Sequence, residues 1–180
     1  MNLNNRILVF SYDAGGANLA MAYAYYKNKE GYEVKCFPKG PALKIFENHV
    51  PSLICEEKID FKQNDFVITG TSGMHSDYEM EVIRESKNIV YKTISLLDAT
   101  GNLKMRFSIN GKLLNEEFLP DEIFYEKKFD FLEYPLLKNR VIEKENLYLK
   151  YLKEVFYKTK ILTKNKDILE YKMTYLLVLT

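Results

Sequence analysis

The stretch that decides the fold is residues 6–18, RILVFSYDAGGAN, in which an apolar run leads directly into a pair of glycines. Residues 6–11 form a short apolar run that ends in a turn, which is typical of a strand buried on both faces. Residues 17–30 are rich in Ala, Leu and Met and end at Gly31, so they indicate a helix with glycine just past its C-terminus. The stretch therefore predicts a buried strand, a glycine turn and a helix.

The same succession of elements continues to residue 97. Further strands are expected at residues 32–37, 52–55, 65–69 and 90–97. Helices are expected at residues 42–49 and from Ser76 to about Asn88, where Ser76 and Glu79 form an S-x-x-E capping box. Alternation of strand, glycine-containing loop and helix is typical of a doubly wound parallel sheet. We therefore predict an α/β fold with a mainly parallel sheet, helices on both of its faces, and loops along one edge.

Beyond residue 98 the pattern becomes less regular. Residues 99–119 contain two glycines and are expected to form a long loop with a short hairpin around Asn110-Gly111. The later elements are expected in this order: a strand at residues 122–125, a helix at 145–157, and strand-like pieces at 161–163 and 175–179. The last two pieces have no predicted place in the sheet.

Composition and charge exclude several classes of protein. The chain has 180 residues, 47% of them hydrophobic and 28% charged, which fits one folded domain and not a disordered chain. Its 26 Lys and Arg balance 25 Asp and Glu, without the basic surplus of a nucleic-acid binder. The two cysteines and two histidines are too far apart for a zinc site, so no metal or other cofactor is expected. No run approaches the ~20 apolar residues of a membrane helix and no signal peptide is recognisable, so we expect a cytoplasmic protein.

The loop after the first strand, SYDAGGAN at residues 11–18, is the sharpest local feature. Adjacent glycines let a backbone approach a ligand closely and leave N–H groups at a helix N-terminus, where an anion can bind. Gly15, Gly16 and Asn18 are therefore candidate binding residues, although the same glycines also suit a tight turn without a ligand. Asp13 is a candidate catalytic base or hydroxyl-binding group, and the alternative, slightly favoured, is that it only caps the helix. No third glycine follows, so the dinucleotide-binding fingerprint is absent.

A second loop of the same kind follows the strand at residues 65–69. Its sequence, GTSGMHSD, provides small residues, hydroxyl groups and the start of another helix. Thr71 and Ser72 are candidate binding residues, because two such loops after neighbouring strands line one crevice. His75 is a candidate binding residue or base at the edge of that helix, or else an ordinary surface histidine.

Asp98 directly follows the strand at residues 90–97 and is a second candidate base at the same edge. Asn102 and Arg106 come shortly after it, and an arginine can pair with the phosphate or carboxylate of a ligand. The alternative is an Asp98–Arg106 pair that only orders the loop. The motifs of P-loop nucleotide binding and of the serine-hydrolase nucleophile elbow are both absent.

Taken together, these loops resemble the N-terminal Rossmann-like half of GT-B-type glycosyltransferases and related polysaccharide-biosynthesis proteins. The segments that carry the resemblance are DAGGAN at 13–18, GPA at 40–42, TGTSG at 69–73, LDATGNLKMRF at 97–107 and LPDEI at 119–123. The resemblance covers roughly residues 6–126 and implies a Rossmann-like fold. It also implies that this half binds a sugar acceptor, while a second domain holds most of the nucleotide-sugar donor. Asp13 or Asp98 would then deprotonate the acceptor hydroxyl as it attacks the anomeric carbon of the donor sugar.

Two functional hypotheses follow. In the first, residues 1–158 are the acceptor-side domain, and residues 159–180 are the remnant or the start of a missing second domain. The chain would then be a truncated half of a glycosyltransferase-like protein of surface-polysaccharide synthesis, inactive alone or completed by a partner chain. In the second, the chain is a small binding or regulatory module, flavodoxin-like in outline, that holds a phosphorylated small molecule at the two glycine loops. Neither hypothesis includes nucleic acid or a membrane span.

Overall fold

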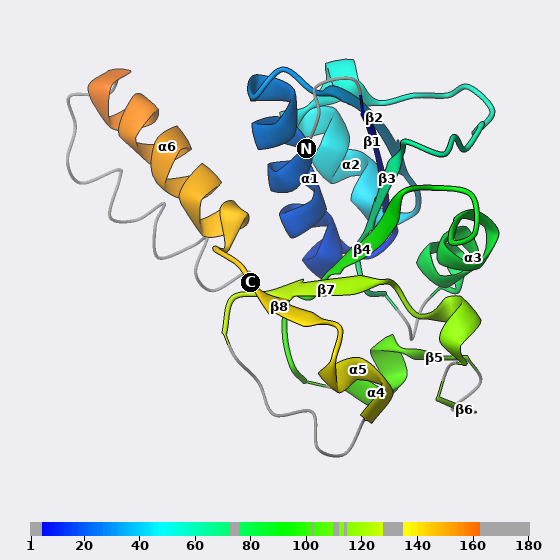
Figure 1. Cartoon of the computed structure of the whole chain (residues 1–180). Coiled ribbons are helices and arrows are strands. Elements are labelled where there is room, and N and C mark those ends of the chain that lie inside the picture. The colour runs from blue at the N-terminus through cyan, green and yellow to red at the C-terminus, as the bar shows by residue number, and fades with distance from the viewer. Residues whose placement is uncertain are drawn as a thin grey trace.

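Six parallel strands in the order β2-β1-β3-β4-β7-β8 form the central sheet (Figure 1). The structure is a computed structural model that describes residues 5–72, 76–101, 103–109, 112–113, 115–127 and 135–162. The strands of the sheet are β1 (Arg6–Ser11), β2 (Glu33–Pro38), β3 (Phe66–Thr69), β4 (Lys92–Leu96), β7 (Glu122–Tyr125) and β8 (Val141–Glu143). Every pair of neighbouring strands runs parallel, which confirms the predicted α/β fold.

Helices cover both faces of this sheet (Figure 1). One face carries α1 (Ala14–Lys29), α2 (Pro41–His49) and α6 (Leu147–Leu162). The other face carries α3 (Tyr78–Ser86). The shorter elements are α4 (Leu103–Arg106), α5 (Pro135–Lys138), the 3-10 turns η1 (Pro51–Leu53) and η2 (Glu116–Phe118), and an antiparallel pair, β5 (Ser108–Ile109) and β6 (Lys112–Leu113). This pair confirms the predicted hairpin, whose tip at 110–111 lies outside the described residues.

The strand β1 is apolar from Ile7 to Phe10 because helices cover both of its faces. Ile7 and Val9 belong to the core cluster under α1, whereas Leu8 and Phe10 belong to the cluster under α3. The Phe10 ring also stacks on Phe37, with ring centroids 5.0 Å apart. A strand in this position has no solvent-facing side, so its sequence shows an unbroken apolar run instead of alternation.

The helix α1 packs closely on the sheet because its buried side chains are mostly alanine. Ala17, Ala20 and Ala24 are fully buried between the sheet and the neighbouring helices. On its other side α1 contacts α6, where the Tyr26 hydroxyl donates a hydrogen bond to Glu154 at 2.9 Å. The core of this face therefore extends from β1 through α1 to α6.

Two elements near the N-terminus differ from the predicted ones. The helix expected from residue 17 begins at Ala14, because both glycines of the loop lie in its first turn. The strand expected at residues 52–55 is replaced by η1 and a single parallel bridge between Cys36 and Ile54. The 3-10 turn takes up Pro51–Leu53, so only Ile54 pairs with β2, which remains the last strand on this side of the sheet.

The C-terminal part also departs from the prediction. The helix expected at residues 145–157 runs instead from Leu147 to Leu162, so it includes the start of the strand-like piece expected at 161–163. Both α5 and β8 were unforeseen, because α5 is only one helical turn and β8 only three residues long. Residues 163–180 lie outside the described part of the chain, so the second domain expected near the C-terminus stays a prediction.

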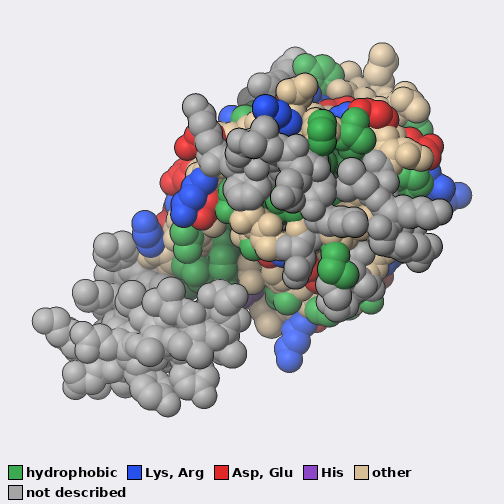
Figure 2. Space-filling view, turned by 90° about the horizontal axis from the view of Figure 1, so that it is seen from below, with side chains coloured by type: hydrophobic (Ala, Val, Ile, Leu, Met, Phe, Trp, Pro, Cys, Tyr) green, Lys and Arg blue, Asp and Glu red, His purple; other side chains and the backbone are tan. Residues whose placement is uncertain are grey.

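The described residues that are visible in Figure 2 form no large patch of a single charge. Basic and acidic side chains are interspersed there, in keeping with a formal net charge of +1. Within the described ranges, none of the helices combines the length and the apolar character that crossing a membrane would require.

Candidate functional site

The predicted site lies where the order of the sheet reverses, at the carboxyl ends of β1 and β3. β2 lies on one side of β1 and β3 on the other, so the chain leaves these two strands in opposite directions. In open parallel sheets a crevice forms at this point, and ligands bind there. The loops that follow Ser11 and Thr69 form the walls of this crevice.

Asp13 holds the first turn of α1 at the crevice. Its backbone is extended, with φ −82° and ψ 165°, and its Oδ1 accepts a hydrogen bond from the Gly16 N–H at 2.9 Å. The Asp13 carbonyl accepts a second bond from the Ala17 N–H at 3.1 Å. The carboxylate is therefore an N-cap, which is one of the two roles that the sequence left open. The side chain is only half-buried, so the cap still lies at the edge of the crevice.

Asp98 and Arg106 form an ion pair that ties two loops together. Arg106 Nη1 contacts Asp98 Oδ1, and it donates to the Thr71 hydroxyl at 3.0 Å and to the Thr71 carbonyl at 3.1 Å. Arg106 Nε donates to the Gly101 carbonyl at 3.0 Å. One guanidinium therefore joins the loop after β3 to the loop after β4, a task for which its fixed fork of donors is suited.

The second oxygen of Asp98 lies against the first turn of α1. A Cβ atom on Gly15 would overlap Asp98 Oδ2, so a larger residue at this position would displace the carboxylate. The carboxylates of Asp13 and Asp98 thus both lie at the N-terminus of α1, where the helix dipole favours negative charge. The position at which a bound phosphate would otherwise sit is already occupied by acidic side chains.

The buried carboxyl group of Glu79, on α3, connects the two glycine loops. It is 2% exposed, its Oε1 accepts the Tyr12 N–H at 3.0 Å, and its Oε2 accepts the Ser72 hydroxyl. Burial raises the pKa of Glu79 to about 7, and the nearby charge of Asp13 adds to the rise, while the bonds from Ser72 and Tyr12 oppose it. A buried carboxyl group at the crevice is therefore near its titration point at neutral pH.

The capping box predicted for α3 is wrong. The helix begins after Asp77, whose side chain makes no capping hydrogen bond. Ser76 Oγ accepts a bond from the Tyr78 N–H at 3.1 Å, while the Glu79 carboxylate binds across the crevice. The spacing S-x-x-E describes only hydrogen bonds within the first turn of a helix. It could not reveal that Glu79 binds the backbone N–H of Tyr12, 67 residues away in sequence.

The two glycine loops touch through their backbones. A Cβ on Gly16 would lie 3.1 Å from the Thr71 nitrogen and 3.2 Å from the Gly70 Cα. A Cβ on Gly70 would lie 3.1 Å from both Glu79 Oε1 and Ser11 Oγ, and this buried hydroxyl has no hydrogen-bond partner among the described residues. The cavity behind the loops measures only about 10 Å³. A ligand would therefore contact the outer rim of the crevice and not its interior.

Most of the predicted site residues do come together. Those that line the crevice or its rim are Asp13, Gly15, Gly16, Thr71, Ser72, Asp98 and Arg106. Asn18 lies further along α1 and is half-buried. His75 and Asn102 lie outside the described residues, so their roles stay predictions. Across the described ranges, no group of three or more His, Cys, Asp or Glu side chains is arranged to hold a metal ion.

Comparison with known proteins adds no assignment. The chain matches no protein-family model, no curated protein and no solved structure at a significant level. Its class therefore follows from the fold and the site alone. It is an α/β protein with a Rossmann-like parallel sheet, whose crevice carries the carboxylates of Asp13 and Asp98 at its rim, the second paired with Arg106.

Proposed function

We propose that this chain is the acceptor-binding half of a glycosyltransferase-like protein of surface-polysaccharide synthesis, and that it binds a sugar at the crevice between β1 and β3. The observation that carries the proposal is the Asp98 carboxylate, held over the first turn of α1 by Arg106. The sequence resemblance described above supports the same assignment.

A hydroxyl-rich ligand suits this crevice better than a phosphorylated one. Ionised carboxylates only accept hydrogen bonds, and sugar hydroxyls donate them. A phosphate at the N-terminus of α1 would face Asp13 and Asp98, two groups of its own charge, at the position where it needs bare N–H donors. The charge arrangement therefore favours the sugar-acceptor hypothesis over the phosphorylated-ligand module.

Asp98 is the better candidate for the base in such a transfer. Its Oδ1 is held by Arg106, while Oδ2 faces Gly15 at the rim of the crevice. As the acceptor oxygen attacks the anomeric carbon, the bond from that carbon to the nucleoside diphosphate breaks and the hydroxyl proton passes to the carboxylate. Asp13, which caps α1 at the same rim, would orient a hydroxyl of the acceptor.

The proposal is tested with a panel of free monosaccharides and short oligosaccharides, using saturation-transfer NMR on the 180-residue protein. Asp98→Asn is expected to weaken sugar binding at least tenfold, roughly the loss of one charge-assisted hydrogen bond. Gly15→Ala is expected to act in the same direction, because its Cβ displaces the carboxylate. Gly101→Ala is the matched control, since a Cβ on Gly101 meets nothing within 4 Å.

The phosphorylated-ligand alternative makes the opposite prediction in the same experiment. Removing the charge of Asp98 would then strengthen the binding of inorganic phosphate or of a nucleoside diphosphate, because a like charge is removed. Phosphate binding that Asp98→Asn improves, together with no sugar bound by the wild-type protein, would refute the sugar-acceptor proposal.

A further inference from the structure

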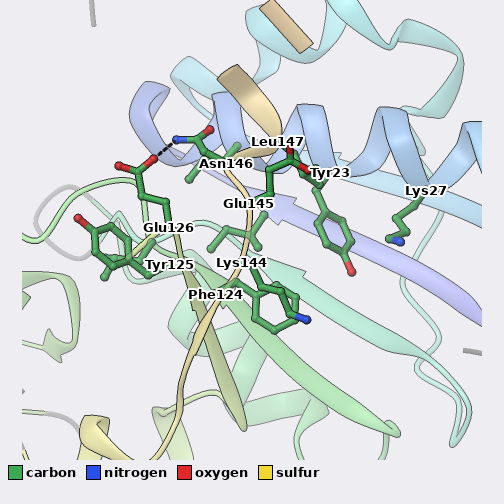
Figure 3. Close-up of a pocket in the computed structure, with 12 residues that line it drawn as sticks. Tyr23, Lys27, Phe124, Tyr125, Glu126, Lys144, Glu145, Asn146 and Leu147 are labelled. Carbon is green, nitrogen blue, oxygen red and sulfur yellow. Dashed lines mark hydrogen bonds between the residues drawn. The ribbon is translucent and has the colours of Figure 1, made fainter. Parts of the chain in front are cut away.

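A cavity of about 350 Å³ lies apart from the glycine loops, on the face of the sheet that α1 and α6 cover (Figure 3). Its walls come from three places far apart in sequence: α1, the ends of β4 and β7, and the segment that joins β8 to α6. The volume is at the lower end of the range for small-molecule sites. None of the residues proposed for sugar binding lines it.

The inner walls of this cavity are apolar. Leu19 and Tyr23 project from successive turns of α1, and Leu96 and Phe124 lie at the ends of β4 and β7. Figure 3 shows the Tyr23 ring extending from α1 toward the strands. Tyr23 is 4% exposed, and burial raises the pKa of its hydroxyl, so the group is neutral at ordinary pH. An apolar chain or ring that packs against these side chains would be buried away from water, which is favourable.

Lys144 lies at the mouth of the cavity. Lys144 lies along Phe124, with its ammonium 5.4 Å from the ring centroid, and among the described residues it forms no ion pair. Lys27, the other lysine of the lining, is paired with Glu30 at 2.5 Å. Lys144 is exposed, so its charge is available to a ligand that enters from solvent.

The acidic side chains of the lining limit the charge of the ligand. Glu126 accepts a hydrogen bond from Asn146 Nδ2 at 2.9 Å, and Asn146 Oδ1 in turn accepts the Leu149 N–H at the start of α6. Glu145 also lines the cavity and is exposed. A second negative charge on a ligand would face these carboxylates, whereas a single one can be placed at Lys144.

We propose that this cavity is a binding site for a small monoanion with an apolar body, such as a medium-chain or aromatic carboxylate. The apolar part lies between Leu19, Tyr23 and Phe124, and the anionic group contacts Lys144. The inference rests on the cavity and its charges and is independent of the proposed sugar site.

The test is calorimetric titration of the full chain with octanoate, with octanol as the uncharged partner of the same length. Octanoate is expected to bind with a stoichiometry of about one and more tightly than octanol. Lys144→Met keeps the apolar stem over Phe124 but removes the charge, and it should weaken octanoate binding about fivefold while leaving octanol unchanged. Lys39→Met is the matched control, because Lys39 also covers an aromatic ring, 4.1 Å from the Tyr78 centroid, but lies outside the cavity.

A second variant locates the ligand. Leu19→Trp fills the cavity and is expected to abolish binding of both probes, provided that circular dichroism shows the helical content of the wild-type protein. If Leu19→Trp does not fold, the proposal is tested by comparing octanoate binding of Lys144→Met with that of Lys39→Met. Equal binding of octanoate by the wild-type protein and Lys144→Met, or undiminished binding by a folded Leu19→Trp variant, would overturn the proposal.

Discussion

At about pH 8 the Glu79→Gln variant is expected to be more stable than the wild-type protein by about 3 kcal/mol. The reason is that the folded protein holds the pKa of Glu79 near 7, whereas an unfolded chain gives a glutamate its ordinary value of about 4.3. Above pH 7 the folded wild-type protein must therefore keep a buried carboxylate ionised. Glutamine keeps the shape, accepts the Tyr12 N–H with its oxygen, and can donate its amide to the Ser72 hydroxyl.

The sign of this effect sets the pH window in which it is seen. Between about pH 4.5 and pH 7 the folded state binds more protons at Glu79 than the unfolded state does, so wild-type stability falls as pH rises. The stability that protonated Glu79 contributes is fully present below the pKa of the unfolded state. It is lost as the pH rises through the pKa of the folded state, about 7. Glu79→Gln should remove this decline, because it has no group to titrate.

Urea unfolding across this pH range measures the effect. Glu85→Gln is the matched control, since Glu85 is on the same helix, α3, but is exposed. The free energy of unfolding of Glu85→Gln should equal that of the wild-type protein at every pH. A Glu79→Gln curve that runs parallel to the wild type would show that Glu79 is ionised in the folded protein at all these values, contrary to the expectation.

The fold was predictable largely because β1 and β3 are buried on both faces and so appear in the sequence as apolar runs. Residues 6–11 and 122–125 were predicted with the boundaries that β1 and β7 have in the structure. The start of α1 was misjudged because the two glycines were assigned to a turn before the helix, although Asp13 had been considered as its cap. A three-residue strand such as β8 carries too little pattern to be found before its partner strand is known.

The site was predictable for a topological reason. Loops after β1, β3 and β4 all emerge at the carboxyl edge of the same sheet, so Asp13, Thr71 and Asp98 had to approach one another. The role of Glu79 could not be predicted, because it depends on a contact with the Tyr12 backbone that no local spacing encodes. The apolar cavity escaped prediction for the same reason, since its walls are assembled from segments distant in sequence.

Gly16→Leu is expected to destabilise the protein by about 2 kcal/mol, despite placing a better helix former in α1. Overpacking of a close contact costs ~1–3 kcal/mol, while the gain in helix propensity is under about 1 kcal/mol. The cost should fall in the upper part of that range, because two of the atoms that a Cβ would meet, the Thr71 nitrogen and the Gly70 Cα, belong to backbone and cannot turn aside. Urea unfolding near neutral pH measures the loss, and Gly101→Leu, with open space at its Cβ, should cost almost nothing.

The same substitution should also weaken the pH dependence that Glu79 causes. A leucine at Gly16 pushes the loop after β3 away from α1, and this admits water to the carboxyl group that bridges Tyr12 and Ser72. With less desolvation the pKa of Glu79 falls toward its ordinary value, so the folded protein no longer resists ionisation there. The gain from Glu79→Gln at about pH 8 should then be smaller in the Gly16→Leu background than in the wild type, a non-additivity expected of groups in one contact network. Full additivity of the two substitutions would show that the glycine contact and the buried carboxyl group are independent, and that the two loops are not held as one unit.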